Sequence, residues 1–175
     1  MTDTAELVAR LARRAEEDGD PVRPPLDPAE LARAEEALGF ALHPLLAAVY
    51  TRVGDGGFGP ECHLLNLTGR FSAVDNYLGQ RRELAGTDWA WPEGVLPVLD
   101  WGCGMFACVD CRSDEGTVLL FEPNPGDPDT AWFVDAPSLA GWFTRHLENT
   151  GWWGDEDEPV DMPLWPDARS RAATA

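Results

Sequence analysis

Four short β-rich segments between residues 94 and 136 constrain the fold more than any other part of this sequence. They read GVLPVLDWG, MFACVDC, TVLLFEP and AWFVD, and turn-forming sequences such as RSDEG and NPGDPD separate them. This spacing predicts an antiparallel meander rather than parallel crossovers. Pro97 has no amide hydrogen, so we expect its strand at an edge or irregular. The run CHLLNL at 62–67 predicts a further strand.

Helical periodicity precedes and follows the β-rich segments. Apolar residues recur at helical spacing in four stretches, at about 3–18, 28–38, 44–52 and 71–85. Asp27, Pro28 and Glu30 form a strong helix start. The stretch DAPSLAGWFTRHLENT predicts a closing helix, with His146 on its solvated side. The expected class is α+β: N-terminal helices, a central antiparallel sheet of four to six strands and a closing C-terminal helix.

The loop GDGGFG at 54–59 matches the spacing G-x-G-x-x-G of dinucleotide-binding turns. A phosphate cradle needs a strand before the glycines and a helix after them, whereas here a helical stretch comes first. Asp55 places a negative charge in the loop, and no basic residue follows until Arg70. We therefore predict a structural turn and no cofactor, with Gly54 as a helix C-cap. Glycine is expected for backbone freedom at four positions: Gly54, Gly56, Gly57 and Gly104.

The charge balance restricts the partners of the chain. Its 31 acidic and 13 basic residues give a net charge of −18, and all the basic residues are arginines. Nucleic-acid binding depends on neutralising phosphates, so nucleic acid and anionic membrane surfaces are not expected partners. A basic protein is favoured. The N-terminus MTDTAELVAR is unlike a secretory signal, and no apolar run is long enough to span a bilayer, so we expect a cytoplasmic protein.

The cysteines allow two interpretations. The chain has four, Cys62, Cys103, Cys108 and Cys111. A zinc site usually has two closely spaced ligand pairs, whereas only Cys108 and Cys111 have that spacing here. In a strand, FACVDC would turn these two side chains to opposite faces. We favour free thiols without a metal, and a zinc-dependent domain is the weaker alternative.

No arrangement of residues in the sequence predicts catalysis. The three histidines are His43, His63 and His146. Cys62 and His63 are adjacent, and adjacent residues of a strand point to opposite faces, which disfavours a nucleophile and base pair. No serine lies in a nucleophile-elbow pattern. We therefore expect no enzyme and no catalytic residues.

The last part of the chain combines tryptophan with acidic residues. We expect one domain over residues 1–149 and an acidic tail rich in Trp and Pro over 150–175. An aromatic pair beside an acidic run is typical of an interface anchor with a charged rim. An equally good interpretation is that the pair attaches the tail to the domain. The candidate partner-binding residues are Trp152, Trp153, Asp155, Glu156, Asp157 and Glu158.

Over about residues 27–148 the chain resembles the SUKH superfamily, in particular its Smi/Knr-type branch. AEEALGFALHPLLAAVYTRVGDGGF is similar to the family's acidic helix, Leu-Gly, Leu-Pro-like helix start and glycine pair. The matching residues are Leu38, Gly39, Leu42, Pro44, Gly56 and Gly57. WGCGMFACVD with GTVLLFEP resembles the family's glycine-led hairpin, and DAPSLAGWFTRHL its closing helix. The chain departs from the pattern at His43, before Pro44, and at Met105, after Gly104.

The resemblance implies a binding module rather than an enzyme. Many bacterial members of the family are immunity proteins that neutralise polymorphic toxins, commonly nucleases, and others are intracellular scaffolds. We therefore expect a non-catalytic immunity protein for a basic, nuclease-type toxin, as a monomer or weak homodimer. The alternative is a scaffold or regulator without a toxin partner. If the family binds partners through the Gly104 region, Met105 sets this chain apart there.

Overall fold

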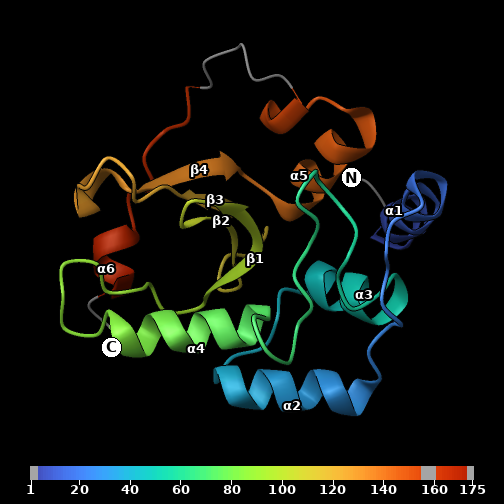
Figure 1. The fold of residues 1–175 in the computed structure, drawn as a ribbon, viewed down its shortest axis with the longest axis horizontal. Helices are drawn as coiled ribbons and strands as arrows, with labels where there is room; N and C mark the ends of the chain where they lie inside the picture. Colours follow the sequence, from blue (N-terminus) through green and yellow to red (C-terminus); the bar gives the residue numbers. More distant parts are fainter. Residues whose placement is uncertain (1–3, 155–160, 173–175) are drawn as a thin grey trace.

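A four-stranded antiparallel sheet lies at the centre of the fold, with helices around it (Figure 1). The structure is a computed structural model that describes residues 4–154 and 161–172. The strands are β1 (Val95–Gly102), β2 (Met105–Asp110), β3 (Val118–Phe121) and β4 (Trp132–Ala136). Their order in the sheet is their order in the chain, so each strand pairs with the one before it. The predicted meander and the α+β class are confirmed.

The first strand is irregular, as its proline predicts. β1 lies at an edge of the sheet, and its register with β2 shifts between Pro97 and Leu99. The hairpin from β1 to β2 turns through Cys103 and Gly104, whose φ angles are 51° and 79°. A two-residue turn with positive φ at both central positions matches the twist of the flanking strands. Gly104 adopts this φ without strain because it has no Cβ.

The described residues form six α-helices and two short 3-10 helices. The α-helices are α1 (Thr4–Asp18), α2 (Pro28–Leu38), α3 (Pro44–Arg52), α4 (Ala73–Glu83), α5 (Leu139–Glu148) and α6 (Ala168–Ala172), and the 3-10 helices are η1 (Pro128–Thr130) and η2 (Trp152–Gly154). Asp27 and Glu30 form the predicted capping box of α2. None of the described helices combines the length and hydrophobicity needed to cross a lipid bilayer.

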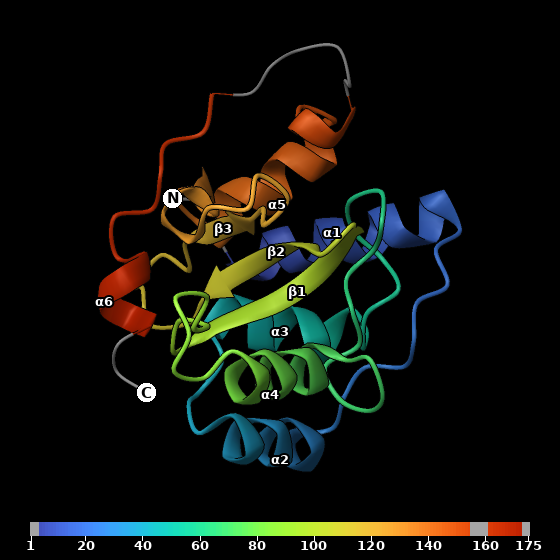
Figure 2. The same cartoon turned by 60° about the vertical axis from the view of Figure 1, so that its left-hand side comes forward.

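The helices pack in two groups. Figure 2 shows α2, α3 and α4 together on one side of β1 and β2, where α4 contacts β1 and α2 packs on α4. The second group is formed by α1 and α5, which pack on each other, and both also contact α3. Arg14 of α1 joins the two helices because it donates hydrogen bonds to the carbonyl of Leu147 (3.4 Å) and to Asn149 Oδ1 (2.9 Å).

A row of aromatic side chains crosses the sheet. Phe106, Phe121 and Trp132 are register partners on β2, β3 and β4, so they share one face. Trp91 packs on this row, with ring centroids 5.0 Å from Phe121 and 4.9 Å from Trp132. Trp165, from beyond residue 150, lies 6.0 Å from Trp132 and is buried. Residues before and after the expected domain limit thus share one aromatic cluster, and the division at residue 149 stays a prediction.

The glycine-rich loop differs from its prediction at one position. α3 ends at Arg52 and Val53 is its C-cap, so the prediction of Gly54 as the cap is wrong. Position 54 requires glycine because it has no room for a side chain. A Cβ there would lie 2.3 Å from Val22 Cγ1 and 2.4 Å from the carbonyl oxygen of Arg23. Gly56 and Gly57 have φ angles of +76° and +80°, which glycine adopts without strain.

The strand predicted at 62–67 is absent from the described sheet, and this prediction is wrong. The backbone turns at His63, whose φ is 60°. Leu64 and Leu67 are nevertheless buried, which explains their strand-like apolar pattern. The segment reaches β1 through one backbone hydrogen bond, from Leu65 N to Val98 O (2.9 Å). This bond lies at the bulge beside Pro97, where an extended ladder cannot form.

Candidate binding surfaces

Trp152 and Trp153, the predicted anchor pair, lie against the domain in η2. Trp101, at the end of β1, packs on both rings, with centroid distances of 5.0 Å to Trp152 and 5.8 Å to Trp153. Trp153 also contacts Trp142 of α5 at 5.6 Å. Both members of the pair are half-buried. The predicted acidic run, Asp155, Glu156, Asp157 and Glu158, lies outside the described residues.

A buried carboxylate fixes the position of this tryptophan cluster. Asp135 is 8% exposed and accepts hydrogen bonds from Trp142 Nε1 (2.9 Å) and from Arg145 (2.8 Å). The guanidinium of Arg145 also lies over the ring of Trp153, 5.8 Å from its centroid. The pair therefore attaches the chain after α5 to the domain. The exposed parts of its rings, beside Trp101, form one candidate contact surface.

The cysteines do not gather into a metal site in the part of the chain that the structure describes. Cys62 and Cys103 are exposed, Cys108 is buried and Cys111 is half-buried. No three His, Cys, Asp or Glu side chains among the described residues lie close enough to hold an ion. Burial raises the pKa of the Cys108 thiol well above its usual value and that of Cys111 to about 12. Both thiols are therefore neutral at pH 7 and unreactive.

His146 is buried, so the prediction that solvent surrounds it is wrong. Its side chain is 7% exposed. Burial, together with the nearby positive charge of Arg14, lowers the pKa of His146 to about 4. His63 contacts Asp20 at 3.3 Å, and His43 Nε2 lies 3.1 Å from the carbonyl oxygen of Asp114. At neutral pH His146 is an uncharged part of the packing between α5 and its neighbours.

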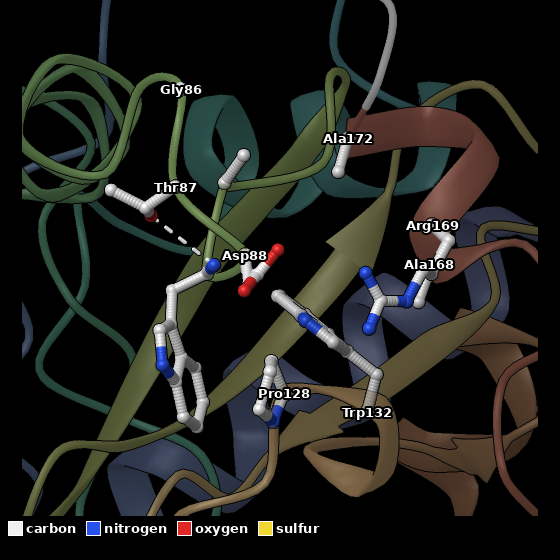
Figure 3. A pocket seen from close by; sticks show the side chains of 10 residues that line it. Gly86, Thr87, Asp88, Pro128, Trp132, Ala168, Arg169 and Ala172 are labelled. Atoms are coloured by element: carbon white, nitrogen blue, oxygen red, sulfur yellow. Dashed lines mark hydrogen bonds between the residues drawn. The ribbon is translucent and has the colours of Figure 1, made fainter.

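A pocket that sequence reasoning missed lies between the loop after α4, the start of β4 and α6 (Figure 3). Its volume is about 380 Å³, within the range of small-ligand sites. In Figure 3 the side chains of Asp88, Trp132 and Arg169 point into the same space. The lining residues are Gly86, Thr87, Asp88, Trp89, Ala90, Pro128, Trp132, Ala168, Arg169 and Ala172.

Two of the lining residues are tryptophans whose rings are held in place by their neighbours. Trp132 is 7% exposed and packs against Trp91, Phe121 and Trp165. Trp89 is held by an edge-on contact with Phe121, with 6.4 Å between centroids. The Thr87 hydroxyl accepts a hydrogen bond from the backbone N–H of Trp89 (3.2 Å), which fixes the loop. The pocket is therefore formed before any ligand arrives.

The two charged residues in the pocket have different surroundings. Arg169 pairs with the carboxylate of Asp129, so its charge is compensated. Asp88 is exposed, and within residues 4–154 and 161–172 we find no ion pair or hydrogen bond of its carboxylate. Little in the sequence pointed to this site. α6 lies in the segment expected to be a tail.

The family match covers most of the fold. The model of the SMI1 / KNR4 family (SUKH-1) matches residues 25–145, close to the span over which the resemblance was predicted. No curated protein matches the chain. The matched region runs from the capped start of α2 into α5 and includes the whole sheet. It leaves out α1, η2 and α6, so each candidate surface combines matched and unmatched segments.

Proposed function

We propose that this chain, which belongs to the SMI1 / KNR4 family (SUKH-1), is a non-catalytic binding domain that neutralises a basic, nuclease-type toxin in the cytoplasm. Domains of the family are generally non-catalytic. The observation that carries the choice of partner is the net charge of −18 in a chain without lysine. Such a surface attracts a nucleic-acid-binding protein, whose own binding face must be basic.

Ion pairs within the chain strengthen this argument. Many arginines contact a carboxylate of the same chain; each pair compensates one positive and one negative group, so the excess of carboxylates is unchanged while fewer arginines remain to repel a basic partner. These pairs are Arg14–Asp18, Arg82–Glu83, Arg112–Glu93, Arg145–Asp135, Arg169–Asp129 and Arg171–Asp110. Because acidic residues outnumber basic ones by more than two to one, most carboxylates keep their charge uncompensated by a pair of this kind.

Two helices carry acidic residues where they disfavour the helix. α1 ends with Glu16, Glu17 and Asp18, of which Asp18 pairs with Arg14, and neither α1 nor α2 has a basic residue in its last turn. Carboxylates near a helix C-terminus oppose the helix dipole, at a cost of about 0.3–1 kcal/mol each. α4 and α5, by contrast, have basic residues in their last turns. The carboxylates at the end of α1 reduce the stability of that helix, and their presence there supports a role for them in binding.

The experiment is an inhibition assay with a candidate toxin. A suitable candidate is the C-terminal nuclease domain of a secreted multidomain protein encoded beside this chain. We expect the nuclease rate to fall linearly with added chain and to reach zero near a one-to-one ratio. Full nuclease activity at a tenfold molar excess, with no complex on a sizing column, contradicts the proposal and favours a scaffold or regulator.

Salt dependence separates charge attraction from other modes of binding. Long-range attraction acts on the association rate, and a Debye length of about 8 Å at physiological ionic strength screens it. We expect association with the toxin to slow by about tenfold or more as salt rises from dilute buffer to high concentration, with less change in dissociation. A salt-independent association rate would contradict the role of net charge.

A further inference from the structure

We propose that the pocket between the 86–90 loop, β4 and α6 receives an arginine side chain of the basic partner, an inference that rests on the proposed function. The pocket offers the two features that a guanidinium group prefers. Its lining includes Trp89 and Trp132, and in Figure 3 the ring of Trp132 and the carboxylate of Asp88 point into it. A planar cation can stack on an indole and donate hydrogen bonds from its edge to the carboxylate.

The aromatic walls are preorganised for this role. Trp132 is fixed by the aromatic cluster of the sheet, and Trp89 by Phe121 and by the hydrogen bond from its N–H to Thr87. Binding a ligand therefore costs little entropy in ordering these side chains. Tryptophan is the best aromatic partner for a cation, and Arg is the cation most often found on it.

The charges in the pocket favour a cation over an anion. Arg169 is the positive group of the lining, and its pair with Asp129 compensates it. Asp88 remains as a carboxylate without an ion pair among the described residues, in a chain of net charge −18. An incoming guanidinium can donate a charge-assisted hydrogen bond to Asp88.

α6, which completes the pocket, lies outside the region that the family model matches. The loop at 86–90 and Trp132 lie within the matched region 25–145, whereas Ala168, Arg169 and Ala172 lie outside it. α6 is held in place through Arg171, which pairs with Asp110 and whose carbonyl accepts a hydrogen bond from Glu93 N (3.2 Å). The matched region supplies the 86–90 loop and Trp132, and α6 supplies the rest of the lining named above.

The test uses the full chain and a small probe. The indole N–H signals of the ¹⁵N-labelled protein are followed by NMR during titration with Nα-acetyl-arginine amide, and with Nα-acetyl-citrulline amide as a neutral probe of the same shape. We expect saturable shifts of the Trp89 and Trp132 signals with the arginine probe only. Asp88→Asn should weaken binding by about threefold or more, and Trp89→Ala by a similar factor.

A matched variant controls for net charge. Asp114→Asn removes the same charge from an exposed position outside the pocket, so it should leave the affinity for the probe unchanged. Asp88 is exposed, so Asp88→Asn should fold normally, and the dispersion of its indole signals checks this. Equal binding of both probes, equal effects of the two Asp→Asn variants, or no saturable shift at these signals overturns the assignment.

The toxin assay distinguishes failure of the pocket from failure of the proposed function. If Asp88→Asn loses the arginine probe and also speeds dissociation of the toxin, the pocket is a docking site of the partner. If the variant loses the probe but binds the toxin as tightly as the natural chain, the partner's arginine does not use the pocket, while the proposed function stands. If the natural chain inhibits no toxin, the proposed function fails whatever the probe does.

Discussion

Gly57→Ala is expected to destabilise the protein through two separate effects. The residue has a φ of +80°, a region in which an L-residue with a Cβ is strained. A Cβ at this position would also lie 2.4 Å from the carbonyl oxygen of Pro21 and 3.1 Å from its carbon. These atoms belong to the backbone, so the chain itself must shift to make room.

The magnitude follows from adding the two effects. The positive φ costs roughly 1–2 kcal/mol, and forcing an extra methyl group into a packed site costs about 1–3 kcal/mol. We expect Gly57→Ala to lower the free energy of unfolding by about 2–5 kcal/mol. Gly126→Ala is the matched control, because Gly126 has nearly the same φ, +79°, and an added Cβ there would meet no atom within 4 Å. Gly126→Ala should therefore lower the free energy of unfolding only by the roughly 1–2 kcal/mol that the positive φ costs.

Urea unfolding followed by tryptophan fluorescence measures both variants, since the chain has eight tryptophans. The midpoints should shift while the slopes stay the same. Gly54→Ala adds a third point, because its φ is not in the strained region while its Cβ would meet the Arg23 carbonyl oxygen at 2.4 Å. If Gly57→Ala and Gly126→Ala lose equal stability, the close approach of residues 21–23 to the loop is not a packing constraint, and the reasoning is refuted.

Three further predictions concern pH, the tryptophan cluster and metal. Folding lowers the pKa of His146 from 6.5 to about 4, so the folded chain binds fewer protons than the unfolded chain between these pH values. The free energy of unfolding should therefore fall by about 3 kcal/mol as pH falls from 6.5 to 4. Unfolding curves at pH 7, 5.5 and 4 should show this loss in the natural chain and not in His146→Gln. Trp153→Ala should lower the free energy of unfolding by about 2 kcal/mol, less than the roughly 3–5 kcal/mol for a fully buried ring, because Trp153 is half-buried. Thermal unfolding should show this as a lower melting temperature. Chelation should leave the melting temperature unchanged, and stoichiometric zinc in elemental analysis of the untagged chain would contradict the metal-free prediction.

The sheet could be predicted because its information is local. Each strand is short, and turn residues mark its ends, so pairing between neighbours follows directly from the sequence. Pro97 predicted an irregular edge strand, and the register shift beside it confirms this. The capping box of Asp27 and Glu30 is equally local, since both hydrogen bonds join residues three apart. Such features need no knowledge of the rest of the fold.

The wrong predictions share a different cause, which is contact between distant segments. His146 is a polar residue, yet it shares the buried face of α5 with Leu139, Trp142 and Phe143, where α1 packs on the helix and brings Arg14 near its imidazole. Gly54 looks like a helix cap, but its neighbours are Val22 and Arg23, from the loop between α1 and α2. Periodicity within one segment cannot show that another segment covers it.

The pocket was missed for the same reason, and its construction links fold to proposed function. Trp132 is 7% exposed, so most of its ring belongs to the core. Only the return of the chain along β4 brings α6 over the remaining edge, through the bridge of Phe133 with Leu164 and the bond from Trp165 N to Trp132 O (2.9 Å). A segment outside the family match thus turns a core residue into a pocket wall. Under the proposed binding function, a change in this segment would change the partner without changing the sheet.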